Sequence, residues 1–270
     1  MVGSVAVTIT VLSQKGGTGK TTTVRTLTDA LRRSGLDVLC VDLDPQGNLS
    51  DYYDIPADAS PTVAEVLAGQ ARAADAVHDD VLPANLGLAE AELVLSGKMG
   101  RELALKRALR EVKRAYDLVL VDCPPSLGLL TVNSLVAADH ALITSEAEYF
   151  SLQGVEQALE VIELAKESLH PELDWLGVML NKADMRLVHS REALQSLQGR
   201  FGERVLETVI RRSVRYAESA ERGVSILDYA PDLGADYLAL ADEVLARLGG
   251  FGETRERLRK ASTSAAISAS

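Results

Sequence analysis

A glycine-rich stretch near the start of the chain constrains the fold more than any other feature. Residues 13–22 read SQKGGTGKTT, which keeps the end of the phosphate-binding pattern G-x-x-x-x-G-K-[ST] but has glutamine in place of its first glycine. Glycines allow consecutive backbone N–H groups to turn toward phosphate oxygens. In such a loop Lys20 supplies a charge to the β- and γ-phosphates, and the Thr21 hydroxyl binds Mg²⁺. The predicted nucleotide-binding residues are Lys15, Gly16, Gly17, Thr18, Gly19, Lys20, Thr21 and Thr22.

The segments on either side of this loop support the same interpretation. Val5–Leu12 is an apolar, β-branched run typical of a buried strand, and Thr22–Arg32 reads as a helix. A strand, a glycine loop and a helix in that order place bound phosphates at a helix N-terminus, where backbone N–H groups are free.

Strands and helices alternate along the rest of the chain, with no internal repeat and no dividing linker. This alternation predicts an α/β fold: a single P-loop NTPase domain over 1–250 with a mostly parallel twisted sheet and helices on both faces. Residues 251–270 are polar and rich in Ser and Ala, which predicts a disordered tail. Further strands are predicted at Val38–Asp42, Leu118–Asp122, Ala141–Ser145, Leu176–Asn181 and Arg204–Ile210, with a weak one at Leu86–Ala89. Helices are predicted at Arg101–Ala115 and near 129–137, 152–169, 188–199 and 234–248.

Two predicted strands end in aspartate-containing loops. The first is DLDPQGN, beginning at Asp42, and the second is DCPPS, beginning at Asp122. Taken alone, either segment could be only a turn, because D-P, G-N and P-P are good turn formers. The carboxyl ends of parallel strands share one edge of the sheet, however, so both loops are expected beside the glycine-rich loop.

Together these segments resemble the ParA/MinD family of ATPases, whose deviant Walker A motif carries an extra early lysine, here Lys15. The match is to its ParA/Soj-like partition members. DLDPQGN resembles the family's switch I, and the strand followed by D-x-P-P resembles its Walker B and switch II element. Glu148–Gly154 and Val214–Glu218 also match family segments, so the resemblance covers about residues 5–248.

The resemblance implies a slow, Mg²⁺-dependent hydrolysis of ATP to ADP and phosphate in a homodimer bridged by nucleotide. Lys15 would cross the dimer interface to the partner's phosphates, and Asp44 would orient the attacking water. Asp42 would belong to the outer shell of Mg²⁺, while Asp122 would hold a metal-bound water and Thr21. The NKAD segment at Asn181 resembles a guanine signature, but the family places such an asparagine near adenine, which favours ATP. The family's proline near the base is replaced here by the run Ile210–Ser213.

Charge and the family together indicate DNA as a partner. A net charge of −11 argues against a wholly basic DNA-coating protein, yet residues 186–222 hold eight arginines against five acidic residues. The resemblance places Arg215 at the position of a DNA-contacting arginine, and it implies non-specific binding of double-stranded DNA and stimulation by a ParB-like protein. Arginines on mixed-charge helices are often only solvated or salt-bridged. The residues that would extend the DNA-binding patch are Arg186, Arg191, Arg211, Arg212 and Arg222.

Membrane attachment, which MinD-like members achieve through a terminal amphipathic helix, is not expected. The basic segment Arg255–Lys260 has Leu258 as its single apolar anchor. The first ten residues lack the basic start of a signal peptide. We therefore expect a cytoplasmic, nucleoid-associated protein.

Two other functions share this fold. One is an ATPase that positions a protein cargo, and the other is an ATP-dependent ligase similar to dethiobiotin synthetase. The nitrogenase iron protein and cluster-scaffold ATPases fit less well, because Cys40 and Cys123 supply no paired cysteines. The motifs leave open whether a chromosome, a plasmid or a protein assembly is moved.

Overall fold

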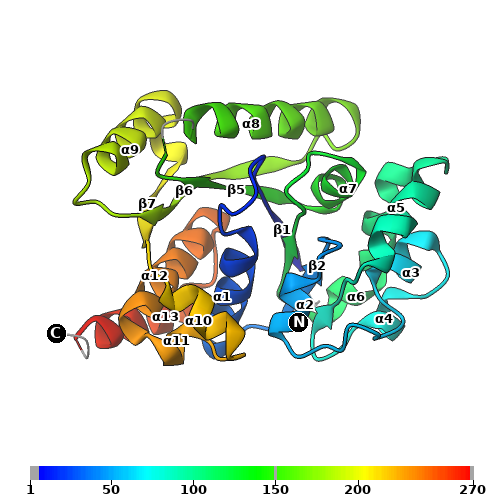
Figure 1. The fold of residues 1–270 in the computed structure, drawn as a ribbon, viewed down its shortest axis with the longest axis horizontal. Helices are drawn as coiled ribbons and strands as arrows, with labels where there is room; N and C mark the ends of the chain where they lie inside the picture. The colour runs from blue at the N-terminus through cyan, green and yellow to red at the C-terminus, as the bar shows by residue number, and fades with distance from the viewer. Residues whose placement is uncertain (1–5, 149–150, 268–270) are drawn as a thin grey trace.

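A seven-stranded parallel sheet forms the centre of the molecule (Figure 1). The computed structural model describes residues 6–148 and 151–267, so Val5, Tyr149 and Phe150 of the predicted segments lie outside the described residues. The strand order is β3-β2-β4-β1-β5-β6-β7, with β1 at the middle. The strands are β1 (Val7–Leu12), β2 (Val38–Asp42), β3 (Val81–Leu82), β4 (Leu118–Asp122), β5 (His140–Glu146), β6 (Asp174–Ala183) and β7 (Val205–Arg211).

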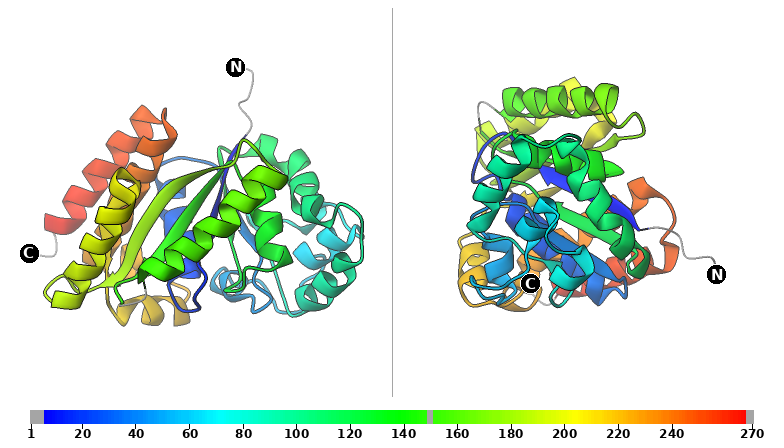
Figure 2. Two further views of the ribbon diagram at one scale, coloured as in Figure 1. Left: turned by 90° about the horizontal axis from the view of Figure 1, so that it is seen from above. Right: turned by 90° about the vertical axis from the view of Figure 1, so that its right-hand side faces the viewer.

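Helices cover both faces of this sheet (Figures 1 and 2). The α-helices are α1 (Lys20–Arg33), α2 (Asn48–Tyr52), α3 (Val63–Ala68), α4 (Ala73–Ala76), α5 (Gly87–Ser96), α6 (Ala104–Val112), α7 (Leu129–Ala137), α8 (Ser151–Ser168), α9 (Val188–Phe201), α10 (Arg215–Glu221), α11 (Ile226–Tyr229), α12 (Pro231–Leu248) and α13 (Gly252–Ile267). Three short 3₁₀ turns are η1 (Arg101–Leu103), η2 (Lys113–Ala115) and η3 (Gly202–Arg204). None of the helices in the described part of the chain is long and apolar enough to cross a membrane.

The interior strand β4 is apolar along its whole length because both of its faces are buried. Leu118 and Leu120 pack into one core with α1 and α12, whereas Val119 and Val121 pack into another with α3, α5 and α6. A strand in a parallel sheet is buried on both faces, and therefore carries no polar alternation. The predicted fold class is confirmed.

The weak strand predicted at Leu86–Ala89 is wrong. That segment leads into α5, where Asn85 Oδ1 accepts a hydrogen bond from Gly87 N at 3.0 Å. The strand at this edge is instead Val81–Leu82, which pairs with Cys40 and Val41 of β2. A strand of two residues is too short to show the periodicity of apolar residues by which strands are recognised in a sequence.

The predicted disorder of the C-terminal tail is also wrong within the described residues, because residues 252–267 form α13. Leu258 is buried in the core beside α12. Arg255 and Arg259 each contact the Asp242 carboxylate of α12 at 2.9 Å. One apolar anchor and a shared carboxylate thus hold a helix whose composition is otherwise polar.

The outer edge of β7 is closed by side chains. The backbone N–H groups of Glu207 and Thr208 donate to the two Glu243 oxygens of α12 at 2.8 and 2.9 Å. Arg211 N donates to Asp236 at 3.3 Å. Carboxylates therefore occupy donors that an edge strand would otherwise present to another strand.

Candidate nucleotide site

The glycine-rich loop joins the end of β1 to the start of α1 and is tightly curved. Gly17 and Gly19 have φ angles of 81° and 86°, in the left-handed region. A Cβ at Gly19 would stand 2.2 Å from Asn181 Nδ2. Both the backbone angle and the close packing therefore require glycine at position 19.

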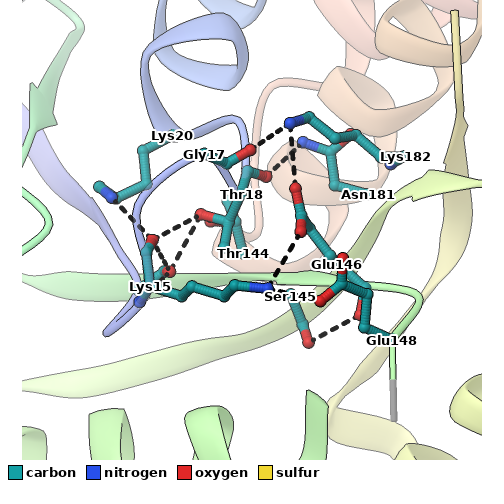
Figure 3. Close-up of polar contacts among 11 residues, drawn as sticks. Lys15, Gly17, Thr18, Lys20, Thr144, Ser145, Glu146, Glu148, Asn181 and Lys182 are labelled. Atoms are coloured by element: carbon teal, nitrogen blue, oxygen red, sulfur yellow. Dashed lines mark hydrogen bonds and ion pairs between the residues drawn. The ribbon is translucent and has the colours of Figure 1, made fainter. Parts of the chain in front are cut away.

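The Thr18 side chain joins the loop to the end of β1 and to β5, and it does not line the cavity that Lys20 lines (Figure 3). Its hydroxyl lies 2.9 Å from Ser13 Oγ and 3.0 Å from Thr144 Oγ1. Its carbonyl accepts a hydrogen bond from Asn181 Nδ2 at 2.8 Å. Thr144 was missed in the sequence analysis; its only signal is a hydroxyl residue within the apolar strand β5.

Lys20, the first residue of α1, points into the loop. Its side chain is buried, and Nζ lies 3.4 Å from Lys15 O. Burial lowers the pKa of Lys20, while the nearby Asp122 carboxyl acts in the opposite direction. An ammonium group that forms no ion pair with the described residues, in the middle of a loop, is well suited to an incoming phosphate.

Thr21 and Asp122 form the centre of the predicted metal site. Thr21 Oγ1 donates to Asp122 Oδ2 at 2.6 Å. Asp122 is fully buried, and its other oxygen, Oδ1, has no hydrogen-bond partner in the described structure. Burial, followed by the charge of Asp42, raises the pKa of Asp122 well above its usual range.

An unpaired buried carboxylate oxygen beside a threonine hydroxyl fits the requirements of Mg²⁺. The described residues contain no group of three His, Cys, Asp or Glu side chains that could hold a metal without other ligands. This agrees with Mg²⁺ chemistry, since that ion is usually bound by one or two protein groups together with substrate phosphates and water. Thr21 and Asp122 would be the protein groups here.

Asp42 shapes the loop that follows β2. Its Oδ1 accepts a hydrogen bond from Asp44 N at 3.0 Å, and its Oδ2 accepts from the backbone and hydroxyl of Ser50 at 3.0 and 2.8 Å. Burial raises the pKa of Asp42 to about 6 despite these bonds. The carboxyl is therefore engaged with its own loop, and an outer-shell role toward Mg²⁺ stays a prediction.

Asp44 lines a cavity of about 600 Å³ next to the glycine-rich loop. Its Oδ1 accepts a hydrogen bond from Gln46 N at 3.0 Å, which fixes the carboxylate at the start of the loop. The structure thus brings Asp44 to the nucleotide cavity, as the order of motifs predicts. The other predicted residues lining this cavity are Gly16, Gly17, Gly19, Lys20, Thr21 and Thr22.

Lys15 is turned away from this cavity (Figure 3). Its Nζ hydrogen-bonds Glu148 Oε2 at 2.5 Å and lies 3.8 Å from Glu146 Oε2, which together raise its pKa. The side chain remains 61% exposed. Lys182 binds the other oxygen of Glu146 at 3.0 Å and also donates to Gly17 O. Glu146 was missed, although a carboxylate at the end of a predicted strand is a usable signal.

Asn181 braces the loop from β6. It is almost fully buried and uses its amide on Thr18 O, while its side-chain oxygen accepts from Lys182 N at 2.8 Å. Lys182 then adopts a left-handed φ of 51°. The predicted contact of Asn181 with a base is not tested by these bonds and stays a prediction.

The predicted DNA-binding arginines gather near the carboxyl ends of β6 and β7, where Arg212 N donates to Ala183 O at 3.1 Å. Several of them pair with acids or carbonyl groups. Their contacts are Arg186 with Asp184 at 2.7 Å, Arg211 with Asp236 at 2.8 Å, Arg215 with Asp232 at 3.4 Å and with Tyr229 O at 2.7 Å, and Arg191 with Met185 O and Arg186 O at 3.0 and 2.8 Å. Arg222 lies over the Tyr229 ring at 5.2 Å.

A buried arginine of α1 links the nucleotide cavity to this region. Arg25 Nη2 donates to Tyr216 O of α10 at 2.7 Å, and its guanidinium lies 4.6 Å from the centre of the Tyr52 ring. Both Arg25 and Tyr52 line the cavity that holds Asp44. Sequence analysis missed Arg25 because its hydrogen-bond partner is 191 residues away.

Comparison with known proteins agrees with this geometry. A model of the AAA domain family matches residues 6–175. The sporulation initiation inhibitor protein Soj of Bacillus subtilis is 40% identical, with 88% of this chain and 98% of Soj covered. The uncharacterized protein Rv1708 of Mycobacterium tuberculosis is 41% identical, with 89% of this chain and 79% of Rv1708 covered.

Solved structures include nucleotide complexes. One is cobyrinic acid a,c-diamide synthase of Mycobacterium smegmatis with an ATP analog and magnesium, at a TM-score of 0.74 and 39% identity, with 80% of this chain and 93% of that chain covered. Another is a variant of McdA from Cyanothece in complex with ATP, at a TM-score of 0.82 and 26% identity, with 90% of this chain and 98% of that chain covered.

A parallel sheet with a glycine-rich loop before α1, and with Asp122 beside Thr21, defines a P-loop ATPase fold. Within that class, the similarity to Soj extends over nearly the whole of both chains. The chain belongs to the ParA/Soj family of chromosome-partitioning ATPases, as its motifs indicate.

Proposed function

We propose that this protein is an ATP-dependent dimerising switch that binds double-stranded DNA without sequence preference in its ATP state and takes part in chromosome or plasmid segregation. The observation that carries the proposal is that the two lysines of the glycine-rich loop point in different directions. Lys20 points into the cavity shared with Asp44, whereas Lys15 extends outside it. We place the protein in the cytoplasm on the nucleoid, stimulated by a ParB-like partner. Partition relatives such as Soj support this assignment.

The proposed reaction is transfer of the γ-phosphoryl group of ATP to water, giving ADP and phosphate. Lys20 and the loop N–H groups neutralise charge on the phosphates, and the Asp44 carboxylate accepts a hydrogen bond from the attacking water and orients it. Bound Mg²⁺, held through Thr21 and Asp122, would add positive charge at the phosphates. A site that gains Lys15 only from a second copy would turn over slowly in the monomer.

Lys15→Ala is expected to retain ATP binding but to lose ATP-dependent dimerisation, because Lys15 lies outside its own cavity. Sedimentation velocity with and without ATP measures this directly. Lys260→Ala on α13 is the matched control, since Lys260 is also an exposed lysine paired with a glutamate. Dimerisation of the Lys15 variant at wild-type ATP concentrations would show that Lys15 is an ordinary surface lysine.

Arg215→Glu is expected to weaken DNA binding and to leave basal ATP turnover unchanged. A dimer would lose two phosphate contacts, which should reduce the log–log salt slope by about two. Fluorescence polarisation with a random-sequence duplex at two salt concentrations, with ATP and with ADP, gives both quantities. Arg200→Glu is the control, because the wild-type Arg200 is also an arginine paired with an acid, Glu156 of α8. Asp232→Asn should strengthen binding, because it removes the carboxylate that contacts Arg215.

Equal DNA binding in the ATP and ADP states, or none at low salt, would contradict the partition role. Positioning of a protein cargo would then be favoured. Phosphate release that depends on an added diamino or carboxylate compound would instead favour a ligase of the dethiobiotin-synthetase type.

A further inference from the structure

A basic groove of about 740 Å³ lies among α3, α4, α5 and α6, on the right of Figure 1. Its lining includes the single acidic residue Glu111. The rest of the molecule must be strongly acidic, because the whole chain has a net charge of −11. The groove shares no lining residue with the nucleotide cavity. Its basic residues are Arg72, Lys98, Arg101, Arg107, Arg110 and Arg114.

Three of these arginines form a row on α6 and η2. Arg107, Arg110 and Arg114 follow one another at spacings of three and four residues, which places them on one face. The opposite face of α6 is buried through Leu105 and Leu109, so the position of the row is fixed. Within residues 6–148 and 151–267, the side chains of these three arginines form no hydrogen bond or ion pair. Like charges at these spacings repel one another, although Arg110 and Arg114 lie in the last turns of α6 and η2, where positive charge is favourable.

The floor between the basic residues is apolar. Val66, Leu67 and Ala71 line one wall, and Ala104 and Ala108 line the other; Val66 and Leu67 are largely buried, whereas the three alanines are partly exposed. At the rim Met99 is 98% exposed. A ligand that covers the apolar floor and also neutralises the arginines must therefore carry both apolar side chains and negative charge. Duplex DNA brings the charge, but its sugar–phosphate surface would leave the apolar floor in contact with water.

We propose that this groove docks an acidic, amphipathic segment of a partner protein. Apolar side chains of the segment would cover the floor, and its carboxylates would meet the arginine row in charge-assisted hydrogen bonds. The acidic remainder of the surface repels such a segment and steers it to the groove. Because the two cavities are separate, the docked partner leaves the nucleotide site accessible.

The test uses the full-length protein and a fluorescein-labelled Glu/Leu peptide of about four helical turns, followed by polarisation. The triple variant Arg107→Glu, Arg110→Glu, Arg114→Glu is expected to weaken binding by at least about tenfold. A control triple with the same charge change elsewhere, Arg200→Glu, Arg257→Glu, Lys260→Glu, should bind as the wild type does. Ala108→Glu, which places a carboxylate on the floor, should weaken binding without removing an arginine.

A peptide whose leucines are replaced by serine should bind less tightly, because it cannot cover the floor. Thermal unfolding of each variant establishes that the fold is kept. The proposal is overturned if the wild type does not bind the peptide, or if the groove and control triples lose binding equally. It is also overturned if a random-sequence duplex displaces the peptide and loses its own binding in the groove triple, which would make the groove a DNA surface.

Discussion

Lys20→Ala is expected to abolish measurable ATP binding and hydrolysis. The Lys20 ammonium is buried inside the glycine-rich loop and forms no ion pair with the described part of the chain, so its replacement removes the charge that meets the phosphates. Each hydrogen bond to a charged group contributes about 1.5–3 kcal/mol, which corresponds to a loss of affinity of about 10- to 150-fold per bond, and the ammonium can donate more than one such bond. Titration calorimetry with a slowly hydrolysed ATP analogue measures the loss.

The fold should survive this change. Burial lowers the pKa of Lys20, because removing the ammonium from water disfavours its charged form. Thermal unfolding without nucleotide should therefore give a midpoint close to that of the wild type, while added ATP should no longer raise it. Wild-type affinity in the Lys20 variant would mean that the phosphates bind elsewhere.

Asp44→Ala is expected to bind ATP, to hydrolyse it at least about 100-fold more slowly and to accumulate as the ATP-bound dimer. A positioned base or water-orienting group contributes roughly 10²–10⁴-fold to such reactions. Phosphate release under single-turnover conditions measures the rate, and light scattering measures the dimer.

Asp51→Ala is the matched control for Asp44, because Asp51 is a carboxylate lining the same cavity. If the effect of Asp44 came only from its charge, the two variants would lose activity alike. A loss confined to Asp44→Ala would identify orientation of the water as its role. Hydrolysis at the wild-type rate in the Asp44 variant would remove that assignment.

Local sequence predicted the parts of the fold that depend on local pattern. The buried runs of β2 and β4 begin and end as predicted, because each is a short apolar segment that ends at an aspartate. The edge strand Val81–Leu82 was missed because two residues carry no period. The helix α13 was missed because Leu258 and its arginines are stabilised by residues of other elements.

The residues of the site also fall into two groups, those that local motifs predict and those that depend on distant partners. The glycine-rich loop and the place of Asp44 beside it could be predicted from the sequence because both lie in short, ordered motifs. Arg25 and Thr144 could not, since each acts through a partner more than a hundred positions away. Contacts between residues so far apart in the sequence depend on the topology of the sheet, which cannot be predicted from any single segment.

The closed edge of β7 limits how copies of this chain can assemble. Glu243 occupies two of the amides through which a neighbouring strand would add, and the opposite edge, β3, is only two residues long. Lateral growth of the sheet into a continuous fibre is therefore disfavoured at both ends. Copies of the chain are therefore expected to associate through surfaces made by side chains and loops, and not by adding strands to the sheet.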